Sequence, residues 1–211
     1  MITISYAITC CNEYKEFKRL IKQLLPCIKE NDEIVIQQDE CTDSDALSIK
    51  KYIEQLIDSD SRVRYITYKL NKNFADFKNN LKSNCKKDYI YFIDADETLS
   101  ENMLYYLHQV LDSNPVDLFM VPRANTVKGL TQEHIKVWNW RVDPDGLINW
   151  PDYQSRIVRN KVNIKWEGKV HERIVGYSHI AEFPTDSLDW CLHHNKDIAK
   201  QEQQNNFYSK I

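Results

Sequence analysis

The chain has 211 residues, of which 42% are hydrophobic and 28% charged, and its formal net charge is −3. This length suits one domain with a sizeable core, or a core with an appended subdomain. The charge, spread without a dominant basic block, argues against a general nucleic-acid or membrane-surface binder. No apolar run reaches transmembrane length, and the N-terminus lacks a charged signal-peptide start, so we expect a cytoplasmic protein without a transmembrane segment.

Strands and helices alternate through the first half of the sequence. An apolar strand over residues 2–9 precedes helical spacing of apolar residues over 13–29, which Pro26 bends or ends. The other expected elements here are strands at 33–37, 63–68 and 89–93 and helices at 44–57 and 73–85. This alternation predicts right-handed βαβ units and therefore an α/β fold, a Rossmann-like doubly wound sheet that is mostly parallel, with helices on both faces.

The composition changes after about residue 115. All five tryptophans and all four glycines lie downstream of this point. The elements expected there are strands at 116–122, 135–142, 153–158 and 188–192 and an exposed helix at 195–211, anchored by Ile198 and Phe207. No proline- or serine-rich linker separates the halves, so we expect a nucleotide-binding half over 1–115 and a smaller substrate-side extension over 116–211 within one domain that shares a sheet.

The strand expected over 89–93 runs directly into Asp94-Ala95-Asp96. A short continuous apolar run predicts a strand buried on both faces, and open α/β sheets bind ligands beyond the carboxyl ends of such strands. Asp94 and Asp96 are two residues apart, so in extended backbone they point the same way. Aligned carboxylates favour a hard divalent cation that takes further ligands from substrate phosphates. The alternative is a solvated acidic turn that caps a helix beginning near Ser100.

No glycine-rich phosphate-binding motif occurs in the sequence. There is neither a P-loop nor a G-x-G-x-x-G fingerprint. A phosphate-bearing ligand would therefore need a metal ion or side-chain cations for neutralisation.

The cysteines form no C-x-x-C pair, and several lie in or beside apolar segments, where free cysteine behaves as a small hydrophobe. We expect reduced thiols that are mostly structural. They are Cys10, Cys11, Cys27, Cys41, Cys85 and Cys191.

Five motifs, in this order, resemble the family 2 glycosyltransferases, inverting enzymes with the GT-A fold. They are Asn12-Glu13, Gln38-Asp39 with Cys41-Thr42-Asp43, Asn71 to Asn79, Asp94-Ala95-Asp96, which looks like the family's D-x-D motif, and Trp166-Glu167-Gly168-Lys169-Val170-His171-Glu172 with Leu192-His193-His194. The last is similar to a branch that includes lipopolysaccharide-core glucosyltransferase-like proteins. The likeness covers roughly residues 2–195. It implies transfer of a hexose from a nucleotide-diphosphate sugar to an acceptor hydroxyl.

The resemblance implies a metal site at the acidic pair. Asp96 would bind Mn²⁺ or Mg²⁺, and Asp94 would face the ribose or the same metal. His193 or His194 would complete the site, because imidazole is a ligand that suits Mn²⁺. A lone histidine is more often structural than ligating, so this assignment depends on the D-x-D motif.

The resemblance also implies how the donor is held. Asp39 stands where the family usually reads the base, and a carboxylate there accepts the N3–H of uracil, which favours a UDP-sugar. The family commonly has an acidic residue where this chain has Gln38, so either residue could contact the base. Lys78 either adds a cation near the phosphates or is a solvated helix lysine. The other implied donor-binding residues are Thr9, Asn12, Glu13, Asp94 and Ala95.

Inversion by direct displacement needs a general base near the acceptor hydroxyl. Glu172 is our candidate in the acceptor-side, catalytic half, with His171 beside it as a second candidate or a hydrogen-bonded structural residue. In an extended segment these neighbours face opposite ways, so only one points into the cleft.

The sequence leaves open the roles of the tryptophans and the chemical class of the acceptor. Trp150 and Trp166 flank the candidate acceptor region and could stack on sugar rings, whereas we expect Trp138 and Trp190 in the core. The sequence does not choose between a saccharide, a lipid-linked sugar, a protein and a modified nucleic acid as the acceptor.

Two other functions compete with glycosyl transfer. Asp94-x-Asp96-x-Thr98 spells the nucleophile motif of haloacid-dehalogenase-like phosphatases and phosphotransferases, with Asp94 as nucleophile and Asp96 as general acid. That motif normally lies near the start of such chains, and no later G-D-x-x-x-D follows here. The other alternative is a non-catalytic nucleotide-sugar-binding module. The intact acidic pair and Glu172 argue against it.

Overall fold

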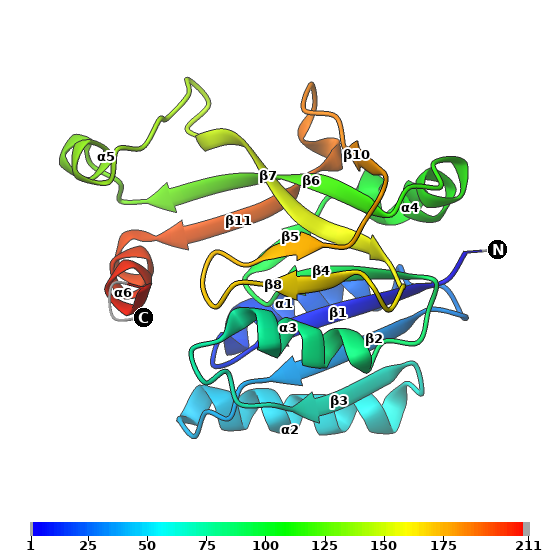
Figure 1. Cartoon of the computed structure of the whole chain (residues 1–211). Coiled ribbons are helices and arrows are strands. Elements are labelled where there is room, and N and C mark those ends of the chain that lie inside the picture. Colours follow the sequence, from blue (N-terminus) through cyan, green and yellow to red (C-terminus); the bar gives the residue numbers. More distant parts are fainter. Residues whose placement is uncertain (1, 209–211) are drawn as a thin grey trace.

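The structure, a computed structural model, describes residues 2–208 and contains a large central sheet with the strand order β3-β2-β1-β4-β7-β6-β11-β5, to which β10 adds beside β6 (Figure 1). The strands of this sheet are β1 Ile4–Cys10, β2 Glu33–Gln38, β3 Val63–Thr67, β4 Tyr89–Asp94, β5 Glu97–Leu99, β6 Leu118–Lys128, β7 Ile148–Arg159, β10 Ile180–Glu182 and β11 Leu192–Asp197. A separate antiparallel hairpin consists of β8 Lys165–Glu167 and β9 Arg173–Val175. The helices are α1 Tyr14–Leu24, α2 Ser44–Ser59, α3 Phe74–Ser83, α4 Glu101–Ser113, α5 Gln132–Trp138 and α6 Ile198–Tyr208.

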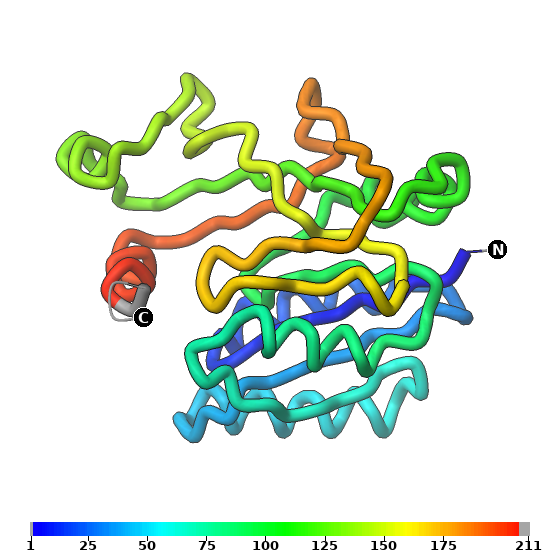
Figure 2. Tube along the Cα trace, viewed as in Figure 1, coloured from blue at the N-terminus to red at the C-terminus, as the bar shows by residue number. Residues whose placement is uncertain are grey.

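The first half forms the parallel part of the sheet, β3-β2-β1-β4. β4 is buried on both faces, because Tyr91 and Ile93 contribute to one hydrophobic core and Phe92 to the other. Helices α1, α2 and α4 pack on the first core, whereas α3 and the β8–β9 hairpin cover the second (Figure 2). The predicted α/β fold with a mostly parallel sheet and helices on both faces is confirmed.

The second half continues the same sheet. β7 pairs antiparallel with β4 and with β6, and β11 then lies parallel to β6 and antiparallel to β5. At the junction Tyr89 is opposite Arg159, and the rings of Tyr89 and Phe119 are in contact across it. The carboxyl ends of β1 and β4 therefore face strands that come from the second half of the chain.

The strand predicted over 135–142 is wrong, because α5 occupies its first half, residues 135–138. The Thr131 hydroxyl accepts the N–H of His134, whose side chain returns to the Thr131 N–H in a capping box. Asn139 ends the helix in the left-handed region with a φ of 53°. No residue of α5 is buried, so the apolar residues that suggested a strand face no core.

Two further extended segments were misplaced. The strand predicted over 188–192 begins instead at Leu192, after a short 3₁₀ helix over Leu188–Trp190, so His193 and His194 lie inside β11. The segment 169–171, which we expected to be strand-like, is a bend in which His171 has a φ of 53°. Alternation along an extended chain therefore does not govern where His171 and Glu172 point.

Cys11 and Cys41 form a disulfide, so the expectation that all the cysteines are reduced thiols is wrong. The two residues are separated by 30 positions, but β1 and β2 are paired in parallel, which brings the loops after their carboxyl ends together. Cys10, Cys85 and Cys191 are free and buried, as predicted for structural thiols, and Cys27 is free and exposed.

The chain ends in α6, which agrees with the helix expected over 195–211 as far as Tyr208. The side chain of the expected anchor Phe207 and residues 209–211 lie outside what the structure describes. Within the described part of the chain, no helix has both the length and the apolar character needed to cross a bilayer.

Candidate active site

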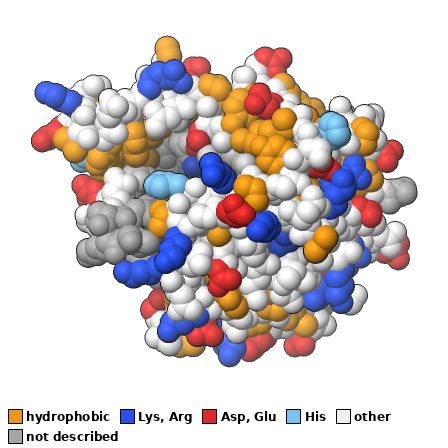
Figure 3. Space-filling view, in the orientation of Figure 1, with side chains coloured by type: hydrophobic (Ala, Val, Ile, Leu, Met, Phe, Trp, Pro, Cys, Tyr) orange, Lys and Arg blue, Asp and Glu red, His pale blue; other side chains and the backbone are white. Residues whose placement is uncertain are grey.

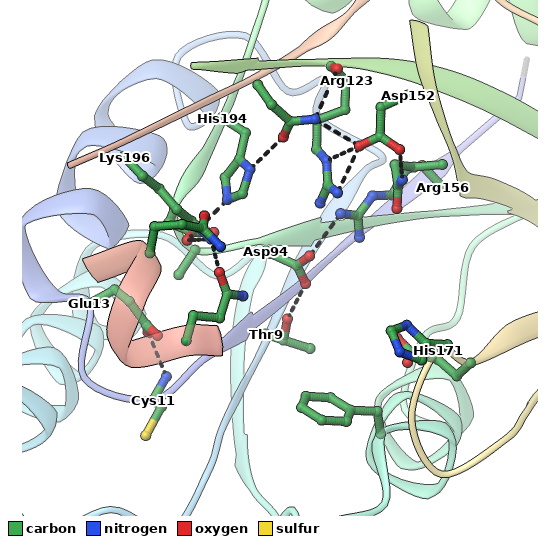
Figure 4. A pocket seen from close by; sticks show the side chains of 18 of the residues that line it. Thr9, Cys11, Glu13, Asp94, Arg123, Asp152, Arg156, His171, His194 and Lys196 are labelled. Atoms are coloured by element: carbon green, nitrogen blue, oxygen red, sulfur yellow. Dashed lines mark hydrogen bonds and ion pairs between the residues drawn. The ribbon is translucent and has the colours of Figure 1, made fainter. Parts of the chain in front are cut away.

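A cavity of about 620 Å³ opens at the carboxyl ends of β1 and β4 and is bordered on its other side by β6, β7 and β11 (Figure 4). This volume is typical of small-molecule sites. The predicted site residues that line it are Thr9, Glu13, Asp39, Lys78, Asp94, Ala95, Asp96, His171, Glu172 and His194. Asn12 and His193 are not among the residues that line it.

Asp94 is the last residue of β4, and Asp96 lies in the turn that follows, so the extended geometry expected for the pair does not hold. Asp94 accepts hydrogen bonds from Arg156 Nη2 at 2.7 Å and from the Thr9 hydroxyl at 2.8 Å. Burial alone would raise the pKa of Asp94, but the charges of Arg156 and Lys78 outweigh it and hold that pKa well below its usual range.

Asp96 faces residues of β11. Its Oδ2 lies 3.3 Å from His194 Nε2 and 3.6 Å from Lys196 Nζ. Burial would raise the pKa of Asp96, but the hydrogen bond and charge of His194 and the charge of Lys196 lower it. His194 Nδ1 is 2.7 Å from the amide oxygen of Asn125, which orients the ring. With Nδ1 facing Asn125, Nε2 is the ring nitrogen directed to Asp96, and it is the one that would bind a metal ion beside that carboxylate.

This donor set is suited to Mn²⁺ or Mg²⁺. A carboxylate and an imidazole supply two protein ligands, and hard cations held by few protein ligands take the others from water and phosphate. Asp94 is directed to Arg156 instead, and among the described residues it does not form a compact three-ligand cluster with Asp96 and His194.

His193 lies on the opposite side of β11 from the metal candidates. Its Nε2 is 3.8 Å from Cys191 Sγ, and burial lowers the pKa of its imidazole. One compact cluster of three potential metal ligands does occur, formed by Cys11, Asp39 and Cys41. Its two sulfur atoms are joined in the disulfide. It offers no thiolate to a metal.

A network of buried charges beneath the acidic pair was missed by the sequence reasoning. Arg156 is 2% exposed, and its guanidinium contacts Glu97 as well as Asp94. Arg123 joins Glu97 to Asp152, with Nη2 2.8 Å from the Asp152 carboxylate. Burial would lower the pKa of Arg156, but the two carboxylates beside it raise that pKa. The available signal was a single arginine, Arg156, inside the strand predicted over 153–158.

The end of β2 shows how the two candidate base readers differ. Gln38 is buried, and its amide nitrogen donates to the carbonyl oxygens of Cys11 and Ala46. Asp39 lines the cavity, and its Oδ1 accepts the N–H of Leu70 at 2.9 Å. Gln38 therefore packs the loops, and Asp39 is the one of the two that borders the open space.

The loop after β1 is held by its own polar residues. Glu13 Oε2 accepts the backbone N–H groups of Cys11 and Asn12 at 2.9 and 3.2 Å. The Asn12 amide donates to Asp43, the residue that caps α2. Asn12 thus shapes the wall of the cavity from behind rather than facing it.

Of the two roles expected for Lys78, that of a solvated helix lysine is wrong, because the residue is only 8% exposed. Its Nζ lies 2.6 Å from Glu172 Oε1 and 4.5 Å from the centre of the Trp166 ring. Trp166 is 4% exposed and packs edge-on against Phe92, so it cannot offer a face to a sugar. His171 and Glu172 both line the cavity from the bend between β8 and β9.

Comparison with known proteins gives one family and a set of structural neighbours. The model of Glycosyl transferase family 2 matches residues 5–171. The crystal structure of S. aureus TarS 1-349 has a TM-score of 0.57 at 13% identity and covers 92% of this chain and 60% of that one. The structure of the same fragment in complex with UDP has a TM-score of 0.57 at 14% identity and covers 92% of this chain and 60% of that one. The structure in complex with UDP-GlcNAc has a TM-score of 0.55 at 14% identity and covers 93% of this chain and 59% of that one.

These identities show a shared fold and nothing finer. The chain spans about 60% of the length of these TarS chains. The expected GT-A type of α/β fold is thereby confirmed. A search of curated protein sequences finds no match.

Proposed function

The chain belongs to glycosyl transferase family 2 and is a glycosyltransferase, and from this premise we propose a metal-dependent inverting enzyme. It moves a hexose from a nucleotide-diphosphate sugar, a UDP-sugar, to an acceptor hydroxyl. The observation that carries the proposal is that Asp39, Asp96 and Glu172 line one cavity. They would serve the base, the diphosphate and the acceptor hydroxyl respectively.

The donor is held by residues at the ends of β1, β2 and β4. Asp39 accepts the uracil N3–H, and Asp94, which Arg156 and Thr9 hold in one orientation, accepts from the ribose hydroxyls. The complexes of S. aureus TarS with UDP and UDP-GlcNAc support a uridine nucleotide, since those proteins share this fold.

The diphosphate lies on the side of β11. Asp96 and His194 hold Mn²⁺ or Mg²⁺ there, and the bound ion supplies Lewis-acid stabilisation of the charge on the leaving diphosphate. Lys196 lines the same side of the cavity and adds a second positive charge. Lys196, beside Asp96, is thus the protein cation on the phosphate side and takes the place of the glycine-rich loop that the sequence lacks.

Glu172 acts as the general base. The ammonium of Lys78 compensates its charge, so the carboxylate is held in the cavity without an uncompensated negative charge. Glu172 then takes the proton of the acceptor hydroxyl as oxygen attacks the anomeric carbon and the bond to the diphosphate breaks. His171, its neighbour in the bend, is the second candidate for this role.

Calorimetric titration with UDP, in the presence and absence of Mn²⁺, tests the metal site. Asp96→Asn removes the ligand charge with little change of shape, so metal-dependent UDP binding should fall by at least about tenfold, which corresponds to ~1.4 kcal/mol. Asp112→Asn, an equivalent change on the exposed face of α4, should bind as the wild type does. Undiminished Mn²⁺-dependent binding by Asp96→Asn would show that the metal is held elsewhere.

Donor hydrolysis across a panel of nucleotide sugars separates the competing functions. A glycosyltransferase should release sugar from one or few donors, and NMR of the transfer product should show the inverted anomer. Phosphate release from phosphomonoesters without sugar release would support the haloacid-dehalogenase-like alternative. Tight UDP-sugar binding without turnover in any donor would support the non-catalytic module.

A further inference from the structure

Residues 129–147, the connection between β6 and β7, extend away from the sheet and contain α5 (Figure 1). We call this segment the aromatic arm. Its helix buries no residue, and Val137 is 71% exposed. Trp138, which we expected in the core, is half-buried on this arm instead. Burial in a core therefore does not account for the aromatic residues that this segment carries.

Three rings are arranged in sequence along the arm. The imidazole of His134 stacks on Trp138 with centroids 5.0 Å apart and planes 13° apart. The rings of Trp138 and Trp140 are 4.7 Å apart. Trp140 lines the active-site cavity. The ring series thus leads from the exposed helix to the wall of the cavity, and apolar side chains gather beside a hollow at this edge of the molecule (Figure 3).

Backbone hydrogen bonds hold Trp140 in place. Its N–H donates to the Ile135 carbonyl at 3.0 Å, just beyond the end of α5. The next residue, Arg141, donates its N–H to Asn149 Oδ1 at 2.9 Å and accepts the N–H of Asn149 at 2.7 Å. These contacts fix the tryptophan relative to the start of β7. A platform that is ordered before a ligand arrives loses little freedom on binding.

The cavity wall beside Trp140 is polar. Asn149, Gln154 and Asn125 line the cavity, and their amide groups already bond to Arg141, Asp152 and His194 respectively. An amide oxygen has two lone pairs and an amide nitrogen two N–H groups, so these bonds leave capacity for a polar ligand. A pyranose ring has a C–H face, which packs on the electron-rich face of an indole, and an edge of hydroxyls that need both donors and acceptors.

We propose that the aromatic arm is the acceptor subsite and that the acceptor is a saccharide, one of whose rings stacks on Trp140, with Trp138 packed behind that indole. The inference rests on the proposed function and names its second substrate. The acceptor ring lies on the indole of Trp140, and its reactive hydroxyl extends into the cavity toward Glu172, which lines the same space.

Saturation-transfer NMR with cellobiose, maltose, lactose and chitobiose, in the presence of UDP and Mn²⁺, tests this subsite. The wild type should give signals from at least one disaccharide. Trp140→Ala should weaken its affinity about tenfold, and Trp140→Phe, which keeps an aromatic face, should retain most of it. Trp138→Ala should have a smaller effect in the same direction, because Trp138 supports the Trp140 ring. Tyr105→Ala is the matched control, because Tyr105 is 76% exposed on α4, at the far end of the molecule from α5 (Figure 1).

UDP affinity, measured on the same samples, reports on the donor site separately. A wild type that binds UDP but none of the disaccharides would overturn the saccharide acceptor and leave the proposed function standing. Equal disaccharide affinities in wild type and Trp140→Ala would overturn the arm as the subsite. Arm-dependent binding of a peptide library without disaccharide binding would overturn the saccharide in favour of a protein acceptor. Failure to bind any nucleotide would instead contradict the proposed function, while the disaccharide signals would still decide the arm.

Discussion

At the scale of single residues, the site is built from charges that are compensated one by one. Glu172 is paired with Lys78, Asp94 with Arg156, and Asp96 with His194. Each carboxylate thus has a cationic or hydrogen-bonding partner before any ligand is present. Such preorganised charges need little rearrangement during a reaction, which is why they stabilise developing charge more effectively than water does.

Replacing Glu172 by Gln tests the general base. The amide keeps the shape of the side chain but cannot take a proton, so transfer should slow by about 10²–10⁴-fold. UDP affinity should stay near that of the wild type, because Glu172 faces the acceptor rather than the donor. Single-turnover transfer and calorimetric titration measure the two quantities.

Glu167→Gln is the matched control for this experiment, since Glu167 is exposed on β8 a few residues away. It should transfer at the wild-type rate. If Glu172→Gln is nearly as active as the wild type and His171→Ala is inactive with normal UDP binding, the base is His171.

At the scale of elements, the donor side of the cavity is made of the loops that follow β1 and β2. The Cys11–Cys41 disulfide joins these loops, and Cys11 itself lines the cavity next to Asp39. The cross-link restricts the same two loops whose side chains are proposed to hold the nucleotide. Loop order and donor affinity should therefore depend on each other.

Cys41→Ser should lower both stability and UDP affinity. A cross-link that closes a loop of 30 residues should contribute about 2–4 kcal/mol to the free energy of unfolding. UDP affinity should fall by roughly tenfold or less, because only the loops and not the metal ligands change. Urea unfolding and calorimetry measure these effects.

Cys27→Ser is the control, because Cys27 is a free, exposed cysteine. Treatment of the wild type with dithiothreitol should reproduce the Cys41→Ser result and should leave that variant unchanged. Identical unfolding and UDP binding by the oxidised and reduced wild type would contradict a structural role for this disulfide.

At the scale of the whole molecule, the two halves of the chain share one sheet and one core. β4 pairs with β7, and the larger hydrophobic core contains Ile8 from the first half together with Phe119 and Leu192 from the second. Neither half can unfold without exposing apolar surface of the other. We therefore predict that residues 1–115 and 116–211 unfold as one cooperative unit.

The distribution of tryptophan makes this prediction measurable. All five tryptophans lie in the second half, so their fluorescence follows that half, whereas far-UV circular dichroism follows the whole chain. Thermal or urea unfolding should give coincident transitions with the two probes. Ile8→Ala, in the first half, should destabilise by about 2–5 kcal/mol and shift both transitions equally. Separate midpoints, or a shift in circular dichroism alone, would show two independent units.

The alternating elements of the first half, and the chemical character of their ends, could be predicted from patterns in the amino-acid sequence. β4 was identifiable as a strand buried on both faces, with Asp94 and Asp96 following it, and the helix beginning after Ser100 is present as α4. These features depend on apolar periodicity and on capping residues within a few positions of each other. Interactions at such short range are encoded locally, so a pattern in the chain is enough to predict them.

Which residues of the site meet depends on contacts between segments that are far apart in the sequence. Lys78 and Glu172 are 94 positions apart and Asp94 and Arg156 are 62 apart, so no local pattern pairs them. His194 rather than His193 faces Asp96 because of where β11 starts and how it is registered beside β6. The strand predicted over 188–192 was placed too early in the sequence to give this arrangement. A strand's register and the approach of distant loops are set by packing of the whole sheet, and that information is spread over the chain rather than held in any one segment.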